Sequence, residues 1–311
     1  MAEPTIGVVV CVYTEQRWND ISAGINALDR QSLKADQILI VVDHNEALEQ
    51  RCRSELTGFG TPVEVVPNKH AQGLSGARNT AVELLTTDLI AFLDDDACPD
   101  GSWLERLAAP FSDDDVWISG GHSSPGWPDQ IRPRWFPAEF DWVVGSSYLG
   151  MPEQDADVRN VHGCSMLFRS SVFSLVGGFA EGVGRVGVLP MGCEETELCI
   201  RLQQERPGTK IRYVPSAEVL HRVSENRVRF GYFLKRCYAE GLSKAQIGKL
   251  VGASESTSDE RRYASEVLPA GVRKGIRSAL HGDVGGLGRA AAIIVGLLVT
   301  AGGYARGRVA G

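Results

Sequence analysis

The sequence lacks any close pair of cysteines. Its seven cysteines are scattered over 311 residues, and no two of them form a CxxC motif. No stretch near the start reads as a secretory signal peptide. We therefore expect free thiols in a reducing cytoplasm and no disulfide framework.

The sequence also lacks low-complexity segments and an apolar run of the roughly 20 residues that a membrane-spanning helix needs. Its C-terminal apolar stretch, residues 290–303, is shorter and lies between Arg289 and Arg306. A short apolar helix with basic flanks is typical of an interfacial anchor on anionic lipid. We expect the tail to hold the protein at the inner face of the cell membrane. The alternative is a helix packed on the main domain.

Charge is unevenly placed along the chain. The whole chain carries a formal charge of −7, yet residues 272–311 hold six basic residues and one acidic residue. The rest of the chain is therefore strongly acidic. An acidic surface repels phosphate backbones, so nucleic acid is not an expected partner.

Short β-branched runs alternate with segments of helical spacing in the first 120 residues. The predicted strands are residues 6–12, 37–42, 63–66 and 89–93, and the predicted helices are 18–29, 75–85 and one after Pro99. Apolar runs of this kind are typical of parallel strands buried on both faces. The pattern predicts an α/β fold, a Rossmann-like doubly wound and mostly parallel sheet.

The remainder is less regular. Residues 120–160 mix aromatic residues with proline and glycine, which predicts a long structured loop that forms a binding surface, a hydrophobic lid over the sheet, or both. Strands are predicted at 165–168 and 210–214, a helix near Glu194, and mainly helix after residue 225.

Polar motifs directly follow three of the predicted strands. Tyr13 and Glu15 follow the first, Asp43 the second, and Asp94, Asp95 and Asp96 the fourth. Ligands of open α/β sheets bind at the carboxyl ends of the strands, so the three motifs predict one binding edge.

The aspartate run predicts a metal site. Adjacent carboxylates repel one another unless a cation relieves the repulsion. Alternate residues of an extended segment point the same way, so Asp94 and Asp96 can share a site while Asp95 faces elsewhere. Such oxygen ligands suit Mg²⁺ or Mn²⁺ that bridges phosphates. The alternative is a solvated acidic turn that caps the next helix.

Two further segments carry candidate chemistry. The loop 68–79 contains glycine, runs into a helix and carries Arg78, so it could hold phosphate, or Ser75 could be a simple N-cap. A second helix opens with Glu194 and Glu195, either of which could deprotonate an acceptor hydroxyl. Acidic residues are also favoured in a first helical turn by the helix dipole alone.

The order of these motifs resembles the family-2 inverting glycosyltransferases of the GT-A fold over roughly residues 5–245. The residues that carry the resemblance are 8–15, 41–43, 73–79, 92–96, 177–179 and 194–201. The sequence departs from the family pattern at Cys11, where proline is usual, at Thr14, where asparagine is usual, and at Glu195, where aspartate is usual. The last change lengthens the side chain by one methylene and leaves Glu194 and Glu195 both open as the base.

The resemblance implies a role for each matching residue. Tyr13 and Glu15 would contact the nucleoside, Asp43 would read its base, commonly uracil, and Arg78 would lie near the nucleotide, where it would offset the charge of the departing diphosphate. Asp94, Asp95 and Asp96 match the metal-binding DxD position, with Mn²⁺ or Mg²⁺ as the cofactor. Glu195 is the first choice for the base, and His221, which by sequence alone is more often structural, matches a position that approaches the metal and diphosphate.

The expected activity is the transfer of a sugar from a nucleotide-sugar to an acceptor hydroxyl with inversion. Residues 1–120 would bind the donor and 121–245 the acceptor, with a helical extension over 246–311. Residues 232–245 resemble bacterial members that transfer sugars or uronic acids to prenyl-phosphate sugars, which implies a glycan or lipid-linked acceptor.

Two alternatives remain at this point. A sugar-1-phosphate nucleotidyltransferase would share the sheet and the metal, but it normally has a phosphate loop with glycine and arginine after the first strand. Residues 11–15 contain neither. A non-catalytic sugar-nucleotide-binding or membrane-scaffold protein is the second alternative.

Overall fold

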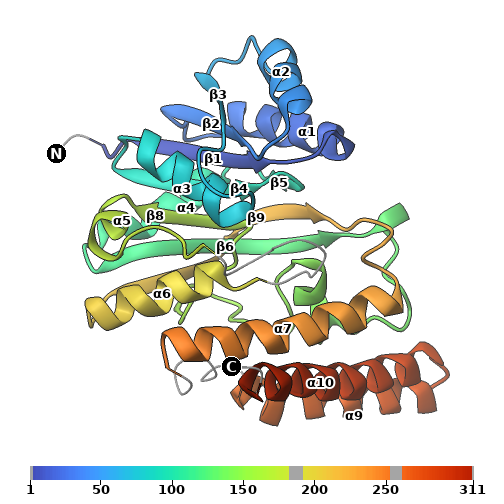
Figure 1. Cartoon of the computed structure of the whole chain (residues 1–311). Helices are drawn as coiled ribbons and strands as arrows, with labels where there is room; N and C mark the ends of the chain where they lie inside the picture. The colour runs from blue at the N-terminus through green and yellow to red at the C-terminus, as the bar shows by residue number, and fades with distance from the viewer. Residues whose placement is uncertain (1–2, 182–191, 253–260, 310–311) are drawn as a thin grey trace. The chain divides into compact units, whose positions relative to one another are not determined.

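The computed structural model describes residues 3–181, 192–252 and 261–309 (Figure 1). The chain forms two compact units. We call residues 1–124, 152–184 and 194–221 the sheet unit, and residues 125–151, 185–193 and 222–311 the helical unit. The predicted domain boundary at residue 245 stays a prediction.

The sheet unit is built on one mixed sheet with the strand order β3-β2-β1-β4-β8-β6-β9-β5. The four strands predicted in the first 120 residues are parallel neighbours: β1 (Ile6–Val12), β2 (Gln37–Val42), β3 (Val63–Pro67) and β4 (Leu89–Asp94). Helices α1 (Trp18–Asp29), α2 (Glu46–Glu55) and α3 (Leu74–Leu84) connect them. The predicted α/β class, with a mostly parallel first half of the sheet, is confirmed.

Alternating side chains of β1 explain why the sheet is covered on both faces. Val8 and Val10 pack into a core cluster with α1, α2 and α4 (Trp103–Ala108). Val9 packs into a second cluster with α3, α5 (Ser171–Val176) and α6 (Glu194–Glu205). Because neighbouring strand residues point to opposite faces, the unbroken apolar run of β1 is buried on both sides.

In the second half of the sheet, the predicted strands at 165–168 and 210–214 are confirmed, whereas the strands at 97–99, 116–126 and 156–157 were missed. The strands β5 (Ala97–Pro99), β6 (Val116–Gly126), β7 (Ala156–Asp157), β8 (Ser165–Arg169) and β9 (Lys210–Arg222) complete it, in pairings such as β4–β8, β6–β8 and β5–β9 that are antiparallel. The predicted loop 120–160 therefore begins as strand and continues through the 3₁₀ segments Pro128–Gln130 and Ala138–Val144. β9 extends eight residues beyond the predicted strand 210–214 and includes His221.

The helical unit contains α7 (Phe230–Leu250), a π-helical turn (Tyr263–Val267), α9 (Leu268–Leu280) and α10 (Gly285–Val309). Glycines let α7 and α10 approach closely: a Cβ added at Gly241 would lie 2.1 Å from the Thr300 carbonyl oxygen, and one at Gly303 would lie 2.2 Å from that of Tyr238. Phe136, from the predicted loop, is buried in the core of this unit.

Candidate active site

The three polar motifs meet at the carboxyl end of the parallel strands. The amide of Asn45, just after β2, donates to the carbonyl of Tyr13 after β1 at 3.1 Å. Arg17, a few residues further along the first loop, forms ion pairs with Asp95 and with Asp96, the latter at 3.1 Å. Parallel strands end at one edge, and the structure brings all three loops into contact there.

His221 joins the aspartates because of the sheet register. β5 pairs with the end of β9 so that Ala97 lies opposite His221, one residue beyond Asp96. One ligand atom each from Asp94, Asp96 and His221 lie within 4.8 Å of one another. His221 Nε2 is 3.0 Å from an Asp96 carboxylate oxygen.

These three side chains fit a divalent cation. Two carboxylates and an imidazole offer the oxygen and nitrogen ligands that Mn²⁺ accepts. His221 is only 2% exposed, and its Nδ1 has no hydrogen-bond partner among the residues that the structure describes. A buried polar atom without a partner is unusual in a folded protein, and here it belongs to the group that a metal would use.

Asp95 points away from this group, as the extended geometry predicts. It is 5% exposed and pairs with Arg17. Burial raises the pKa of Asp95 to about 7, against the opposing effect of the Arg17 guanidinium. Arg17 was not a sequence candidate. Its position in the loop after the first strand was the signal available.

Arg78 lies deeper than the sequence suggested. Its guanidinium is 2% exposed and donates to Glu194 at 2.9 Å, to the Gly163 carbonyl at 2.9 Å and to Asp94 at 3.4 Å. It therefore connects a carboxylate of the candidate metal site with the first residue of α6.

Glu195 differs from its neighbour in exposure. Glu194 is 4% exposed and is paired with Arg78, whereas Glu195 is half-buried. A Cβ added at Gly163 would lie 3.5 Å from a Glu195 carboxylate oxygen and 3.1 Å from the Arg78 guanidinium. The Glu195 carboxylate therefore sits beside the same buried cation.

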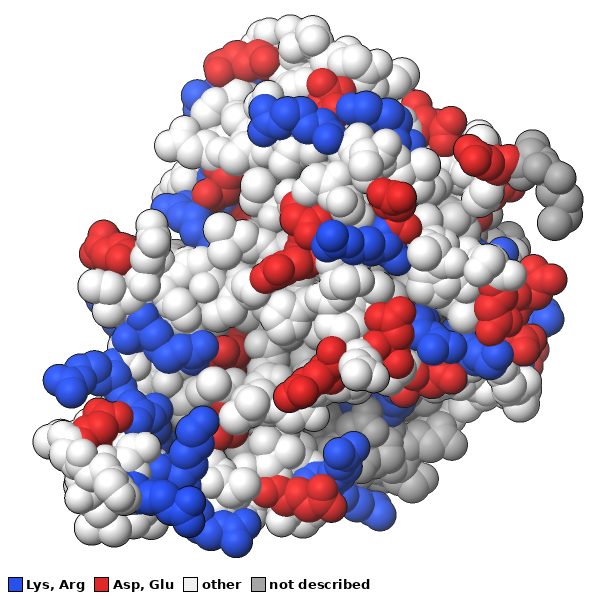
Figure 2. Space-filling model, turned by 180° about the vertical axis from the view of Figure 1, so that it is seen from behind, with Lys and Arg blue, Asp and Glu red and all other residues white. Residues whose placement is uncertain are grey.

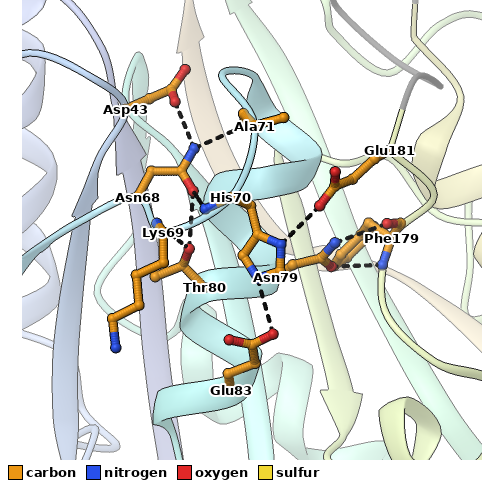
Figure 3. Close-up of polar contacts among 10 residues, drawn as sticks. All are labelled: Asp43, Asn68, Lys69, His70, Ala71, Asn79, Thr80, Glu83, Phe179 and Glu181. Carbon is orange, nitrogen blue, oxygen red and sulfur yellow. Dashed lines mark hydrogen bonds and ion pairs between the residues drawn. The ribbon is translucent and has the colours of Figure 1, made fainter.

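Asp43 anchors the glycine-containing loop (Figure 3). Asn68 donates to one of its carboxylate oxygens at 2.7 Å, and the Gly73 backbone N–H donates to the other at 3.0 Å. The Thr80 hydroxyl donates to the Asn68 side chain and so joins the loop to α3. Gly73, with φ 137°, is the N-cap residue of α3. The alternative that Ser75 is the N-cap is therefore wrong.

Asn79, in α3 beyond the glycine-containing loop, contacts the glycine motif at residues 177–179. The Asn79 amide exchanges hydrogen bonds with the backbone of Phe179 at 2.8 and 3.0 Å (Figure 3). A Cβ at Gly178 would lie 2.4 Å from the Asn79 side-chain oxygen. His70 bridges Glu83 and Glu181. Asn79 and Gly178, which carry part of the resemblance, thus hold α3 against residues 178–179, just after α5.

Comparison with known proteins agrees with this geometry. Residues 7–177 match Glycosyl transferase family 2. The chain is 31% identical over 266 residues to the glucosyl-dolichyl phosphate glucuronosyltransferase of Haloferax volcanii, covering 85% of this chain and 83% of that protein.

Two solved structures share the fold at 14% identity. One is the mannosyltransferase PcManGT from Pyrobaculum calidifontis in complex with GDP-Man and Mn²⁺, with a TM-score of 0.58 over 96% of this chain and 87% of that one. The other is GalNAc-T7 with UDP, GalNAc and Mn²⁺, with a TM-score of 0.55 over 86% of this chain and 57% of that one.

The chain belongs to glycosyl transferase family 2. It is a glycosyltransferase that uses a nucleotide-sugar donor. This assignment decides against both the nucleotidyltransferase and the non-catalytic scaffold that composition and motifs left open.

Proposed function

We propose that this protein transfers a hexose or hexuronic acid from a UDP-sugar to a hydroxyl of a lipid-linked sugar, with inversion and with Mn²⁺ or Mg²⁺ as cofactor. The observation that carries the proposal is the grouping of Asp94, Asp96 and His221 within 4.8 Å at the edge where the Asp43 loop also lies. The lipid-linked acceptor is suggested by the name of the Haloferax relative.

Asp94, Asp96 and His221 would hold the cation, which would supply positive charge to the departing diphosphate. Glu195 takes the proton from the acceptor hydroxyl. That oxygen forms a bond to the anomeric carbon as the bond to the diphosphate breaks, and the nucleoside diphosphate leaves with the bonding electrons. A single displacement of this kind inverts the anomeric configuration.

Exposure favours Glu195 over Glu194 as the base. A base must reach the proton that it accepts, and the Glu194 carboxylate is already paired with Arg78 and almost wholly buried. Glu195 has solvent access and lies beside Gly163. Arg78 is then a positioning residue, which fixes Asp94 on one side and the start of α6 on the other.

The nucleoside would lie against the loops after β1 and β2. The Tyr13 ring is 46% exposed and Glu15 is exposed, so both are open to a ligand. Asp43 already accepts from Asn68 and Gly73, and one of its oxygens lies 2.9 Å from His44 Nδ1. A carboxylate has about four acceptor positions, so it can still accept an N–H from a uracil ring.

The test is transfer itself. Purified protein would be given UDP-glucose, UDP-glucuronic acid or GDP-mannose with a glucosyl prenyl phosphate, with Mn²⁺ or with a chelator, and the lipid product followed by mass spectrometry. We expect product from a UDP-sugar only when metal is present, and an inverted linkage by NMR. Product with retained configuration, or equal turnover with the chelator, would contradict the proposal.

The outer face of α10 supports a peripheral position on the membrane. The helix is longer than the sequence predicted, with 25 residues. Its most apolar 18-residue segment has a mean hydropathy of 1.6, and only 28% of that segment is buried. Leu287, Ile294 and Leu298 recur at helical spacing and are 55%, 48% and 66% exposed. The length and composition of α10 would also allow it to span a bilayer, but its glycine face is packed on α7, and spanning would break that packing.

Basic side chains lie near the turn between α9 and α10. Arg273, Lys274, Arg277 and His281 line a hollow of about 480 Å³ on α9. Figure 2 shows Lys and Arg gathered at this end of the helical unit, at the lower left. Basic side chains and exposed apolar side chains on the same pair of helices suit an anionic bilayer, which offers headgroups to the cations and acyl chains to the apolar side chains.

Flotation of the full chain with vesicles tests this position. We expect binding to phosphatidylcholine vesicles that contain phosphatidylglycerol, weaker binding to phosphatidylcholine alone, and loss of binding in Leu298→Glu. Ala305→Glu, near the end of the same helix and also exposed, is the control and should weaken binding less than Leu298→Glu. Equal flotation of wild type and Leu298→Glu would rule out this surface.

A further inference from the structure

Arg17 sits at the candidate metal site as a built-in cation. Its guanidinium pairs with Asp95 and, at 3.1 Å, with the Asp96 Oδ2 atom, while the other Asp96 oxygen lies 3.0 Å from His221. Both aspartates are about 5% exposed, so they are largely removed from water. Two adjacent buried carboxylates would repel each other strongly without such a partner.

The loop between β1 and α1 fixes the position of Arg17. Arg17 is the last residue of a single 3₁₀ turn, Glu15–Arg17, and the N-cap residue of α1. Its guanidinium also lies 5.2 Å from the centre of the Tyr13 ring, within the range of a cation–π contact. One side chain thus touches the predicted nucleoside contact and the predicted metal ligands.

A divalent cation and Arg17 need the same carboxylate. The candidate ligand group is Asp94, Asp96 and His221, and Asp96 is also the residue that Arg17 pairs with. Asp95 is outside the ligand group and can keep Arg17 as its partner. Two positive charges at one aspartate oppose each other, so each lowers the affinity of the other.

We propose that Arg17 is an internal counterion that neutralises Asp95 and Asp96 in the metal-free protein and competes with the divalent cation for Asp96. This inference rests on the metal dependence proposed above. Its consequence is that Arg17 sets how much free Mn²⁺ or Mg²⁺ the enzyme needs, and it keeps the acidic site folded when the cation is absent.

The experiment measures Mn²⁺ binding by calorimetry, without substrate, in wild type, Arg17→Gln and Arg17→Lys. We expect Arg17→Gln to bind Mn²⁺ about fivefold or more tightly, a coupling at the low end of the usual range for interacting sites. Arg17→Lys keeps the charge and should stay close to wild type. Arg53→Gln, which removes an exposed positive charge of the sheet unit, is the matched control and should change nothing.

A second pair of variants guards against misfolding. Arg17→Gln leaves Asp95 buried without its partner, which costs stability. Asp95→Asn and the double variant Arg17→Gln/Asp95→Asn avoid this, and the double variant should bind Mn²⁺ more tightly than Asp95→Asn alone. Thermal unfolding should show a larger stabilisation by Mn²⁺ in Arg17→Gln than in wild type.

The outcomes separate this inference from the proposed function. If wild type binds Mn²⁺ and neither removal of Arg17 tightens the binding, Arg17 does not compete for Asp96 and the inference is wrong. If wild type binds no Mn²⁺ at all, the metal-dependent function itself fails, and the counterion inference falls with it.

Discussion

Glu194 and Glu195 are adjacent, yet their environments predict opposite consequences of the same substitution. Glu194 is 4% exposed and 2.9 Å from the Arg78 guanidinium, which is itself buried. Removing one partner of a buried ion pair costs about 3–5 kcal/mol. Asp94 at 3.4 Å still offsets part of the Arg78 charge, and the Gly163 carbonyl still accepts a hydrogen bond from its guanidinium, so the lower value applies to Glu194→Gln.

A loss of about 3 kcal/mol corresponds to a fall in Tm of roughly 6–12 °C for a unit of this size. Glu195→Gln removes a half-exposed carboxylate and should leave Tm close to that of wild type. Its effect should appear in turnover, which should fall by about 10²–10⁴-fold if Glu195 is the base. UDP binding in the presence of Mn²⁺ should survive in Glu195→Gln, because binding does not require the proton transfer.

Differential scanning calorimetry and the transfer assay measure the two effects on the same samples. Glu205→Gln, at the exposed end of α6, is the control and should alter neither quantity. A stable Glu194→Gln variant with abolished turnover, together with an active Glu195→Gln variant, would refute the assignment and make Glu194 the base.

Three further predictions concern the packing of Gly178, the reactivity of the Cys199 thiol and the role of His221 as a metal ligand. Gly178→Ala should lower the free energy of unfolding by about 1–3 kcal/mol, because the new Cβ would lie 2.4 Å from the Asn79 side chain. Gly101→Ala, whose Cβ would meet nothing within 4 Å, is the control, and chemical unfolding of both variants measures the difference. Burial raises the pKa of Cys199 to about 12, so its thiol stays protonated and should resist iodoacetamide at pH 8 until the protein is denatured. Rapid labelling of Cys199 in the native protein, measured by mass spectrometry, would contradict this prediction. His221→Ala should weaken Mn²⁺ binding in calorimetry without loss of fold, and unchanged affinity would remove His221 from the ligand group.

The parallel half of the sheet was predictable because its signal is local. β1 is an unbroken apolar run, β2 is apolar after Gln37, and β4 is apolar up to Asp94. The structure keeps the predicted boundaries of all three strands within a residue. The alternation of core faces in β1 follows from strand geometry alone.

The antiparallel half was harder to predict because its strands depend on distant partners. β6 contains serine, glycine and histidine, which give no clear strand period, and it forms by pairing with β8 far along the chain. The strand character of His221 likewise depends on the pairing of β9 with β5.

The site followed the same division. The chemistry of Asp94 and Asp96 was visible in the residue types, but Arg17 and the burial of Arg78 were not. The sequence around an arginine in a loop or helix does not indicate which carboxylates it pairs with, because tertiary packing determines its partners.

The most direct test of the central claim is calorimetric binding of UDP, with and without Mn²⁺, to wild type and to Asp96→Ala, with GDP and dTDP as comparison ligands. We expect UDP to bind wild type in the presence of Mn²⁺, and we expect this binding to be lost when the metal is omitted or Asp96 is replaced. Binding of UDP that is equally tight without Mn²⁺, or in Asp96→Ala, would contradict a metal-held diphosphate at this edge of the sheet.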